Sequence, residues 1–119
     1  MRDTSCHYSC PVEATLDVIG GKWKAVILFH LMPGPMRFCD LKRRLPAITQ
    51  RMLTLQLREL EEDGIIHREI YKQIPPKVEY SLTEFGKTLE PILLTMRQWG
   101  ELYTNQIVEQ KSALQPPPP

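Results

Sequence analysis

The stretch FCDLKRRLPAITQRMLTLQLRELEEDG, residues 38–64, decides the fold of this 119-residue chain. Its apolar residues recur at helical spacing and predict a short helix over 38–45 and a second helix over 50–63. Pro46 closes the first helix, Thr49 is a favourable N-cap for the second, and Gly64 is a natural residue just past its end. Because only a few residues connect the two helices, they are expected to cross sharply, as in a helix-turn-helix.

Two further helices are predicted upstream of this stretch. Residues 11–19 repeat apolar side chains at helical spacing behind a leading proline, whose missing N–H costs nothing in a first turn. Two glycines at 20–21 end this helix, and a second apolar pattern over 22–32 stops at the Pro-Gly-Pro of 33–35.

Downstream, the period of the pattern changes. Apolar residues alternate over 66–71 and again over 77–82, which predicts two strands joined by a proline-containing loop. Thr83 is a favourable cap for a long last helix, in which Pro91 is expected to cause a kink or a restart. This order of elements predicts a mainly α winged helix-turn-helix with a small β-hairpin wing.

The composition fits one globular domain, since hydrophobic residues make up 42% of the chain. We expect an N-terminal arm over 1–10, the winged helix-turn-helix with the last helix over 11–109, and a flexible proline-ending tail over 110–119. No apolar run approaches the ~18–20 residues that a membrane span needs. The first residues lack the layout of a signal peptide, so the chain is expected in the cytoplasm, away from membranes.

The charge is unevenly distributed along the chain. The net charge is only +1, yet residues 21–58 hold eight Lys and Arg against a single Asp, and residues 59–63 hold four acidic side chains. A basic block within a nearly neutral protein indicates a surface that meets phosphate, although on charge alone a merely solvated basic face is an equal alternative.

The candidate DNA-binding residues follow from the leucine spacing of the second helix. Leu53, Leu57 and Leu60 share one side of it and leave other side chains free to meet base edges near its N-terminus. Lys42 lies on the preceding helix beside Arg43 and Arg44, placed to clamp the DNA backbone. The predicted DNA-binding set is Lys42, Thr49, Gln50, Arg51, Thr54, Arg58, Lys72 and Lys77, the last two flanking the wing turn.

Several segments of the chain look familiar together, namely Cys10-Pro11-Val12, residues 15–24, Arg37-Phe38, residues 50–54, residues 57–64, residues 75–83 and Trp99-Gly100. In this order they resemble the HxlR family of bacterial transcription regulators. The resemblance covers roughly residues 10–103. Two positions depart from the usual pattern, since Cys39 and Leu55 stand where polar residues are commoner.

The resemblance implies a homodimer that binds double-stranded DNA and represses or activates transcription. Its dimer interface would be built from the N-terminal and C-terminal helices, here through Leu16, Leu93, Met96, Trp99 and Tyr103. Two recognition helices related by a two-fold axis would then meet half-sites of a palindromic operator ~34 Å apart.

The resemblance also draws attention to the cysteines. Cys10 matches an N-terminal cysteine that senses oxidants or electrophiles in several members, and it precedes a helix start, whose dipole favours a thiolate. The hypothesis is a redox site at Cys10, with Cys6 nearby; the alternative is that Cys10 is a small buried residue of the dimer interface. Three soft ligands within Cys6-His7-x-x-Cys10, with no clear fourth, are a weak zinc signal, so no metal is expected.

Other functions find less support in the sequence. No nucleophile–base arrangement and no phosphate-cradling glycine loop is present, so we expect neither an enzyme nor a bound cofactor. A small-molecule effector is left open. The alternative function is a winged-helix protein-interaction module that does not bind DNA, because fold alone does not fix function.

Overall fold

The structure is a computed structural model and describes residues 8–114. The elements follow the predicted order, with one added short strand and a short helix before the last one. They are α1 (Pro11–Ile19), α2 (Lys24–Leu31), β1 (Met36–Arg37), α3 (Phe38–Arg44), α4 (Gln50–Glu62), β2 (Ile66–Tyr71), β3 (Lys77–Leu82), α5 (Glu84–Lys87) and α6 (Glu90–Leu114). The mainly α winged helix-turn-helix is therefore confirmed.

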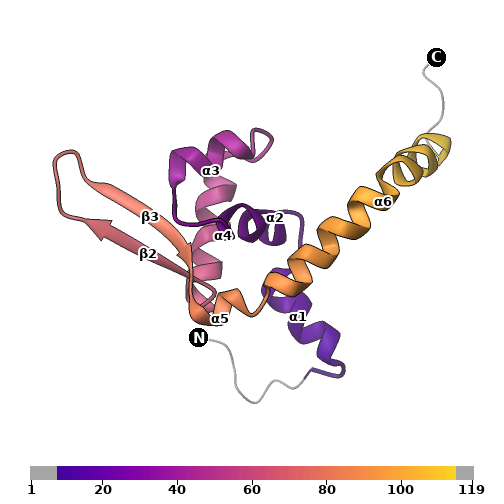
Figure 1. Cartoon of the computed structure of the whole chain (residues 1–119), viewed down its shortest axis with the longest axis horizontal. Helices are drawn as coiled ribbons and strands as arrows, with labels where there is room; N and C mark the ends of the chain where they lie inside the picture. The colour runs from indigo at the N-terminus through magenta and orange to yellow at the C-terminus, as the bar shows by residue number, and fades with distance from the viewer. Residues whose placement is uncertain (1–7, 115–119) are drawn as a thin grey trace.

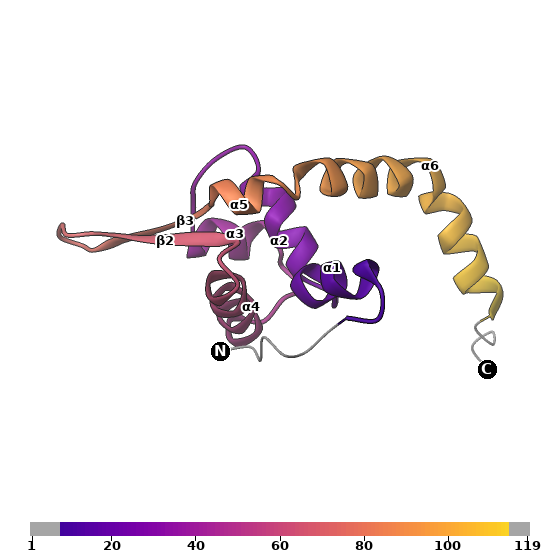
Figure 2. The same cartoon turned by 90° about the horizontal axis from the view of Figure 1, so that it is seen from below.

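The molecule is elongated, with its wing and its last helix at opposite ends. Figure 1 shows the β2–β3 hairpin projecting from one side of the helical body, while α1 and α6 lie on the other side. The view from below places α4 and the loop from α2 to α3 on opposite sides of the body (Figure 2). The extents of 55 × 40 × 26 Å reflect these two projections.

The hydrophobic core lies where the helix-turn-helix, α2 and the base of the wing meet. Leu53, Leu57 and Leu60 of α4 are at most 2% exposed, which confirms the predicted buried side of this helix. They pack with buried residues of the neighbouring elements, namely Ile27, Leu28 and Leu31 of α2, Leu41 of α3, Ile65, Ile66 and Leu93. The core therefore fixes α4 from one side only.

The sheet has three strands in the order β1-β3-β2. Strands β2 and β3 form the predicted antiparallel hairpin, with Ile66 opposite Leu82 and Tyr71 opposite Lys77. Strand β1 was not predicted, because two residues after a proline show no alternation. It pairs with β3 through Met36 and Tyr80, and thereby ties the start of the helix-turn-helix to the wing.

The helix ends follow the predicted caps, with small shifts. The Thr49 side chain accepts a hydrogen bond from the Met52 N–H at 3.0 Å, and Gly64 has the positive φ of 75° expected after α4. Helix α2 begins at Lys24 rather than at residue 22, because Gly21 adopts a φ of 85° and residues 21–23 form a turn.

The last helical region restarts before Pro91. Helix α5 ends at Lys87, and α6 begins at Glu90, which leaves the proline in the first turn, where no N–H is needed. Helix α6 then continues to Leu114, past residue 109, where the sequence places the start of the tail. The boundary between domain and tail stays a prediction.

Candidate nucleic-acid interface

The side of α4 that faces away from the core is mostly polar and includes one exposed leucine. Because the other leucines of this helix are buried, the residues between them are turned outward. Gln50, Arg51, Thr54, Leu55 and Arg58 are all exposed and line one shallow depression of about 630 Å³; we call these five residues the reading face. The structure thus brings together four of the predicted DNA-binding residues, and adds Leu55.

The two arginines of the reading face are free to meet an external anion. Within residues 8–114, neither Arg51 nor Arg58 forms an ion pair with a carboxylate. Thr54, by contrast, donates its hydroxyl to the Gln50 carbonyl at 2.9 Å, so it would meet a base mainly as an acceptor or through its methyl group. Donors that face water rather than a carboxylate are what recognition of guanine and phosphate requires.

The acidic end of α4 is partly neutralised by neighbouring elements. Glu59 accepts a hydrogen bond from the nearly buried Lys24 of α2 at 2.7 Å, and Glu61 lies 3.6 Å from Arg68 of β2. These pairs hold the C-terminal part of α4 against α2 and the wing. They also reduce repulsion between the acidic run and a nearby polyanion.

The basic residues of α3 do not form a single cluster. Lys42 is half-buried and forms no ion pair with a carboxylate among residues 8–114, and its contact with the DNA backbone stays a prediction. Arg43 instead lies 3.4 Å from Asp40, one turn earlier on the same helix. Arg44 lines a separate pocket with His30 of α2, so Arg43 and Arg44 are placed apart from the reading face.

The wing presents its two predicted lysines differently. Lys72 is exposed near the tip, where Ile74 is fully exposed as well. Lys77 lies over the Tyr71 ring at 5.0 Å and its ammonium group is 2.6 Å from Glu79. The alternation of a strand places residues 77 and 79 on the same side, so this pairing was readable from the sequence. Lys72 is therefore the more available of the two cations.

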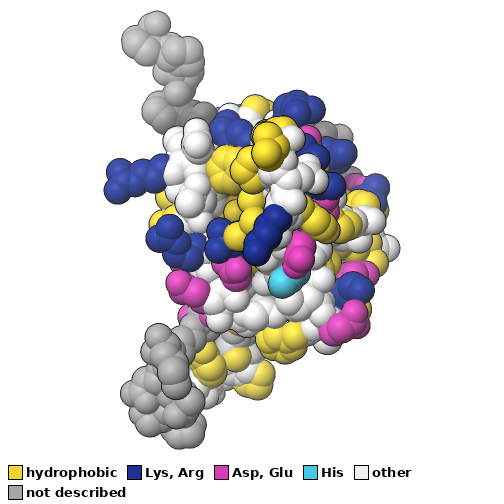
Figure 3. Space-filling view, turned by 90° about the vertical axis from the view of Figure 1, so that its left-hand side faces the viewer, with side chains coloured by type: hydrophobic (Ala, Val, Ile, Leu, Met, Phe, Trp, Pro, Cys, Tyr) yellow, Lys and Arg dark blue, Asp and Glu magenta, His cyan; other side chains and the backbone are white. Residues whose placement is uncertain are grey.

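Seen from the wing end, the surface is divided by charge. Figure 3 shows Lys and Arg side chains gathered over the upper and left part of this face, with Asp and Glu side chains mostly below them. The uneven charge distribution along the sequence therefore persists as an uneven charge distribution in space.

A second surface, on α1 and α6, is apolar. Trp99 and Leu102 are 57% and 68% exposed, and the rings of Trp99 and Tyr103 contact each other at 5.1 Å between centroids. We call the exposed apolar residues Val12, Leu16, Ile92, Met96, Trp99, Leu102 and Tyr103 the apolar surface. It includes four of the five predicted interface residues. Leu93 differs, because it is 3% exposed and packs into the core of its own chain.

Cys10 is exposed and occupies the N-cap position of α1 without a capping hydrogen bond from its side chain. Within one chain it is therefore not a buried core residue. Cys39 on α3 is also free and exposed. Cys6 and His7 lie outside the described residues.

Among residues 8–114, no cluster of three His, Cys, Asp or Glu side chains is placed to hold a metal ion. In the same range, no helix combines the length and the apolar character that crossing a bilayer requires.

Comparison with known proteins agrees with this geometry. The profile of the HxlR-like helix-turn-helix family matches residues 18–108. The HTH-type transcriptional regulator YdeP of Bacillus subtilis (strain 168) is 64% identical over 104 residues, which are 87% of this chain and 81% of that protein.

Two solved structures of one redox regulator, HypR, are also similar. Its reduced form is 63% identical, with a TM-score of 0.80 over 84% of this chain and 99% of that one. Its oxidised form is 70% identical, with a TM-score of 0.76 over 77% of this chain and 95% of that one.

Proposed function

The chain belongs to the HxlR-like helix-turn-helix family of transcriptional regulators, and from this premise we propose that it reads a palindromic operator as a homodimer. The observation that supports the proposal is the reading face of α4. Its five residues are exposed while the leucines on the other side of the helix are buried, and its two arginines form no ion pair with a carboxylate among residues 8–114. Arg51 and Gln50, in the first turn, would contact base edges, while Arg58, Lys42 and Lys72 would contact phosphates. Such a regulator needs no catalytic step and acts in the cytoplasm, where bacterial DNA lies.

The apolar surface supports the homodimer. Large apolar side chains of α1 and α6, such as Leu16, Trp99 and Leu102, are exposed in the single chain. Removing such side chains from water is favourable, which supports an interface there. A second copy of the chain would cover it through a two-fold interface, since the same residues are available on both copies. Helices α1 and α6 lie on the side of the body opposite the wing (Figures 1 and 2), so a dimer formed through them would leave both wings accessible.

The test of DNA recognition is equilibrium binding to the DNA upstream of the protein's own gene. We expect affinity well above that for unrelated DNA of equal length, and a steep loss of affinity with rising salt as phosphate contacts are lost. Equal affinity for both DNAs would reject sequence-specific reading. No binding to either would favour the protein-interaction module.

We further propose that oxidation of Cys10 controls DNA binding. The thiol is free and exposed at the N-cap position of α1, and a similar solved protein is a redox regulator. In an intersubunit disulfide, the Cys10 sulfur would bond to a thiol sulfur of the second copy, both S–H bonds would break, and two electrons and two protons would pass to an oxidant such as diamide. Because α1 carries part of the apolar surface, a covalent change at Cys10 would move α1 and alter the spacing of the two reading faces.

This redox control is tested by comparing reduced and diamide-treated protein on the same operator. We expect oxidation to change the operator affinity of the wild type and of Cys39→Ser, and to leave that of Cys10→Ser unchanged. A full response in Cys10→Ser would reject Cys10 as the site, while operator binding by reduced protein would still stand.

A further inference from the structure

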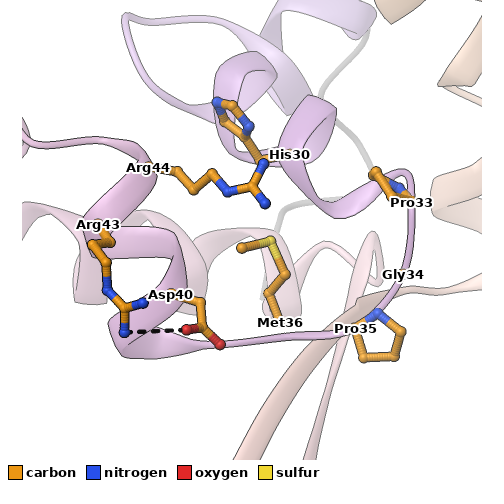
Figure 4. Close-up of a pocket in the computed structure, with 8 residues that line it drawn as sticks. All are labelled: His30, Pro33, Gly34, Pro35, Met36, Asp40, Arg43 and Arg44. Carbon is orange, nitrogen blue, oxygen red and sulfur yellow. Dashed lines mark ion pairs between the residues drawn. The ribbon is translucent and has the colours of Figure 1, made fainter.

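A pocket between α2 and α3 shares no lining residue with the reading face. Its wall consists of His30 at the end of α2, the loop residues Pro33, Gly34 and Pro35, Met36 of β1, and Asp40, Arg43 and Arg44 of α3. Figure 4 shows these side chains arranged around one opening. We call this the α2–α3 pocket; its volume of about 530 Å³ lies within the range of small-molecule sites.

One positive charge in this pocket is not compensated. Arg43 lies 3.4 Å from Asp40, so these two groups largely offset each other. Arg44 extends toward His30 and forms no ion pair within residues 8–114 (Figure 4). Partial burial and the nearby Arg44 charge together lower the pKa of His30, which keeps its imidazole neutral near pH 7. The pair therefore offers one guanidinium and one neutral hydrogen-bonding ring to a ligand.

The opposite part of the wall is apolar. Met36 is half-buried, and Pro33 and Pro35 add ring carbons without donors. A site with a cationic end and an apolar end selects ligands that have both kinds of group. Inorganic phosphate would use only the cationic end, where a single uncompensated guanidinium faces it.

We propose that the α2–α3 pocket binds a small organic carboxylate. Its carboxylate accepts hydrogen bonds from Arg44 and His30, and its apolar part lies against Met36 and the two prolines. A planar guanidinium suits this ligand because it can donate two parallel hydrogen bonds to one carboxylate. A phosphate of bound operator is a poorer candidate, since the loop that lines the pocket lies across the body from α4 (Figure 2).

The position of the pocket gives such a ligand a route to DNA binding. Met36 belongs to β1, which pairs with β3 of the wing at Tyr80, and Arg44 ends α3, which leads into α4. A ligand that contacts both walls would bias the position of the wing relative to α4. This regulatory part rests on the proposed DNA-binding function, whereas carboxylate binding does not.

Binding is tested without DNA, by calorimetric titration of the full chain with benzoate as the probe. We expect saturable binding of one benzoate per chain, and roughly tenfold or more weaker binding by Arg44→Gln, which loses a charge-assisted contact. Arg68→Gln, an equal change on β2 outside the pocket, should bind like the wild type. Benzyl alcohol, which keeps the ring and lacks the charge, should not bind. Absence of saturable benzoate binding, or equal binding by Arg44→Gln, would overturn the proposal.

The pH dependence of benzoate affinity tests whether His30 is the second contact of the carboxylate. The charged groups that line the pocket with His30 are Arg44, Arg43 and Asp40 of α3, while the loop contributes no titratable side chain and β1 lines the pocket only through Met36. A bound carboxylate favours the imidazolium, so benzoate affinity should rise as the pH falls from about 8 to about 6, where carboxylates stay ionised. His30→Gln should remove this rise; an unchanged pH profile would exclude His30 as a contact.

The regulatory part is tested by adding benzoate to the operator titration. A change in operator affinity in the wild type that is absent in Arg44→Gln supports it, and an equal affinity with and without benzoate overturns it. If benzoate binds and no DNA does, the pocket stands and the proposed function fails.

Discussion

Helices α4 and α6 are both amphipathic, but they differ in how much of their apolar side is buried within the chain. Helix α4 is 13 residues long, and its leucines at 53, 57 and 60 are all buried in the chain's own core. Helix α6 is 25 residues long, and Leu93 is its one buried residue among those described. Most of its other large apolar side chains, such as Trp99 and Leu102, are exposed, while Ile107 is half-buried.

This difference separates two kinds of surface. The leucine side of α4 is buried in the core of its own chain. The exposed side of α4 is therefore mostly polar and carries two arginines, which suits binding to a polyanion. Helix α6 offers apolar area outward, which suits a partner that removes it from water. We therefore propose DNA as the ligand of α4 and a second copy of the chain as the partner of α6, and each proposal can be tested separately.

The largest effect is expected from breaking the buried side of α4. Leu57→Ala should lower the free energy of unfolding by about 2–5 kcal/mol, since it removes buried contacts and leaves a cavity. Denaturant unfolding measures this. Leu55→Ala changes an exposed leucine on the same helix and should cost no more than about 0.5 kcal/mol. Similar costs for both would contradict the one-sided burial of α4.

A smaller effect is expected from truncating the apolar surface. Trp99→Ala should weaken self-association by about 2 kcal/mol or more, as is typical of a central interface aromatic. Sedimentation equilibrium over a range of protein concentrations gives the association constant. Gln98→Ala, an exposed polar neighbour on α6, should leave it nearly unchanged. If the wild type stays monomeric at all concentrations, the apolar surface has another role.

Substitutions in the reading face are expected to change operator affinity and base selection rather than the stability of the fold. Arg51→Ala should cost roughly 1–3 kcal/mol in operator affinity and relax selection at one base position. Lys72→Ala should instead weaken binding to all sequences alike and reduce the salt slope by about one phosphate contact. Lys77→Ala should do less, because Glu79 already offsets that charge. Competition among operator variants at two salt concentrations distinguishes these outcomes. A base-specific effect of Lys72→Ala would mean that the wing also contributes to sequence recognition, and not α4 alone.

The smallest effect is expected at the start of α4. Thr49→Ala removes the side-chain cap on the Met52 N–H and should lower stability by about 1 kcal/mol, while Thr49→Ser keeps the hydroxyl and should cost less. Thermal unfolding of the two variants provides the comparison. Identical melting temperatures for wild type and Thr49→Ala would mean that water replaces the cap at no cost.

Much of the recognition site was predictable from local sequence. The leucine spacing of α4 fixes which side is buried, and therefore which residues form the reading face, because helical geometry places every residue relative to its neighbours. The Lys77–Glu79 pair was also within reach, since alternate residues share one side of a strand. Strand β1 could not be predicted from the sequence, because its two residues form a strand only through pairing with β3.

By itself the sequence determined the helix-turn-helix, its caps and the hairpin, since these depend on interactions between residues close in the chain. Only the tertiary structure decided that Lys24 neutralises Glu59, that Leu93 belongs to the core, and that His30 and Arg44 share a pocket. Each of these contacts joins residues that are distant in sequence. Such contacts depend on how the elements pack, and periodicity and capping carry no information about which distant side chains will meet.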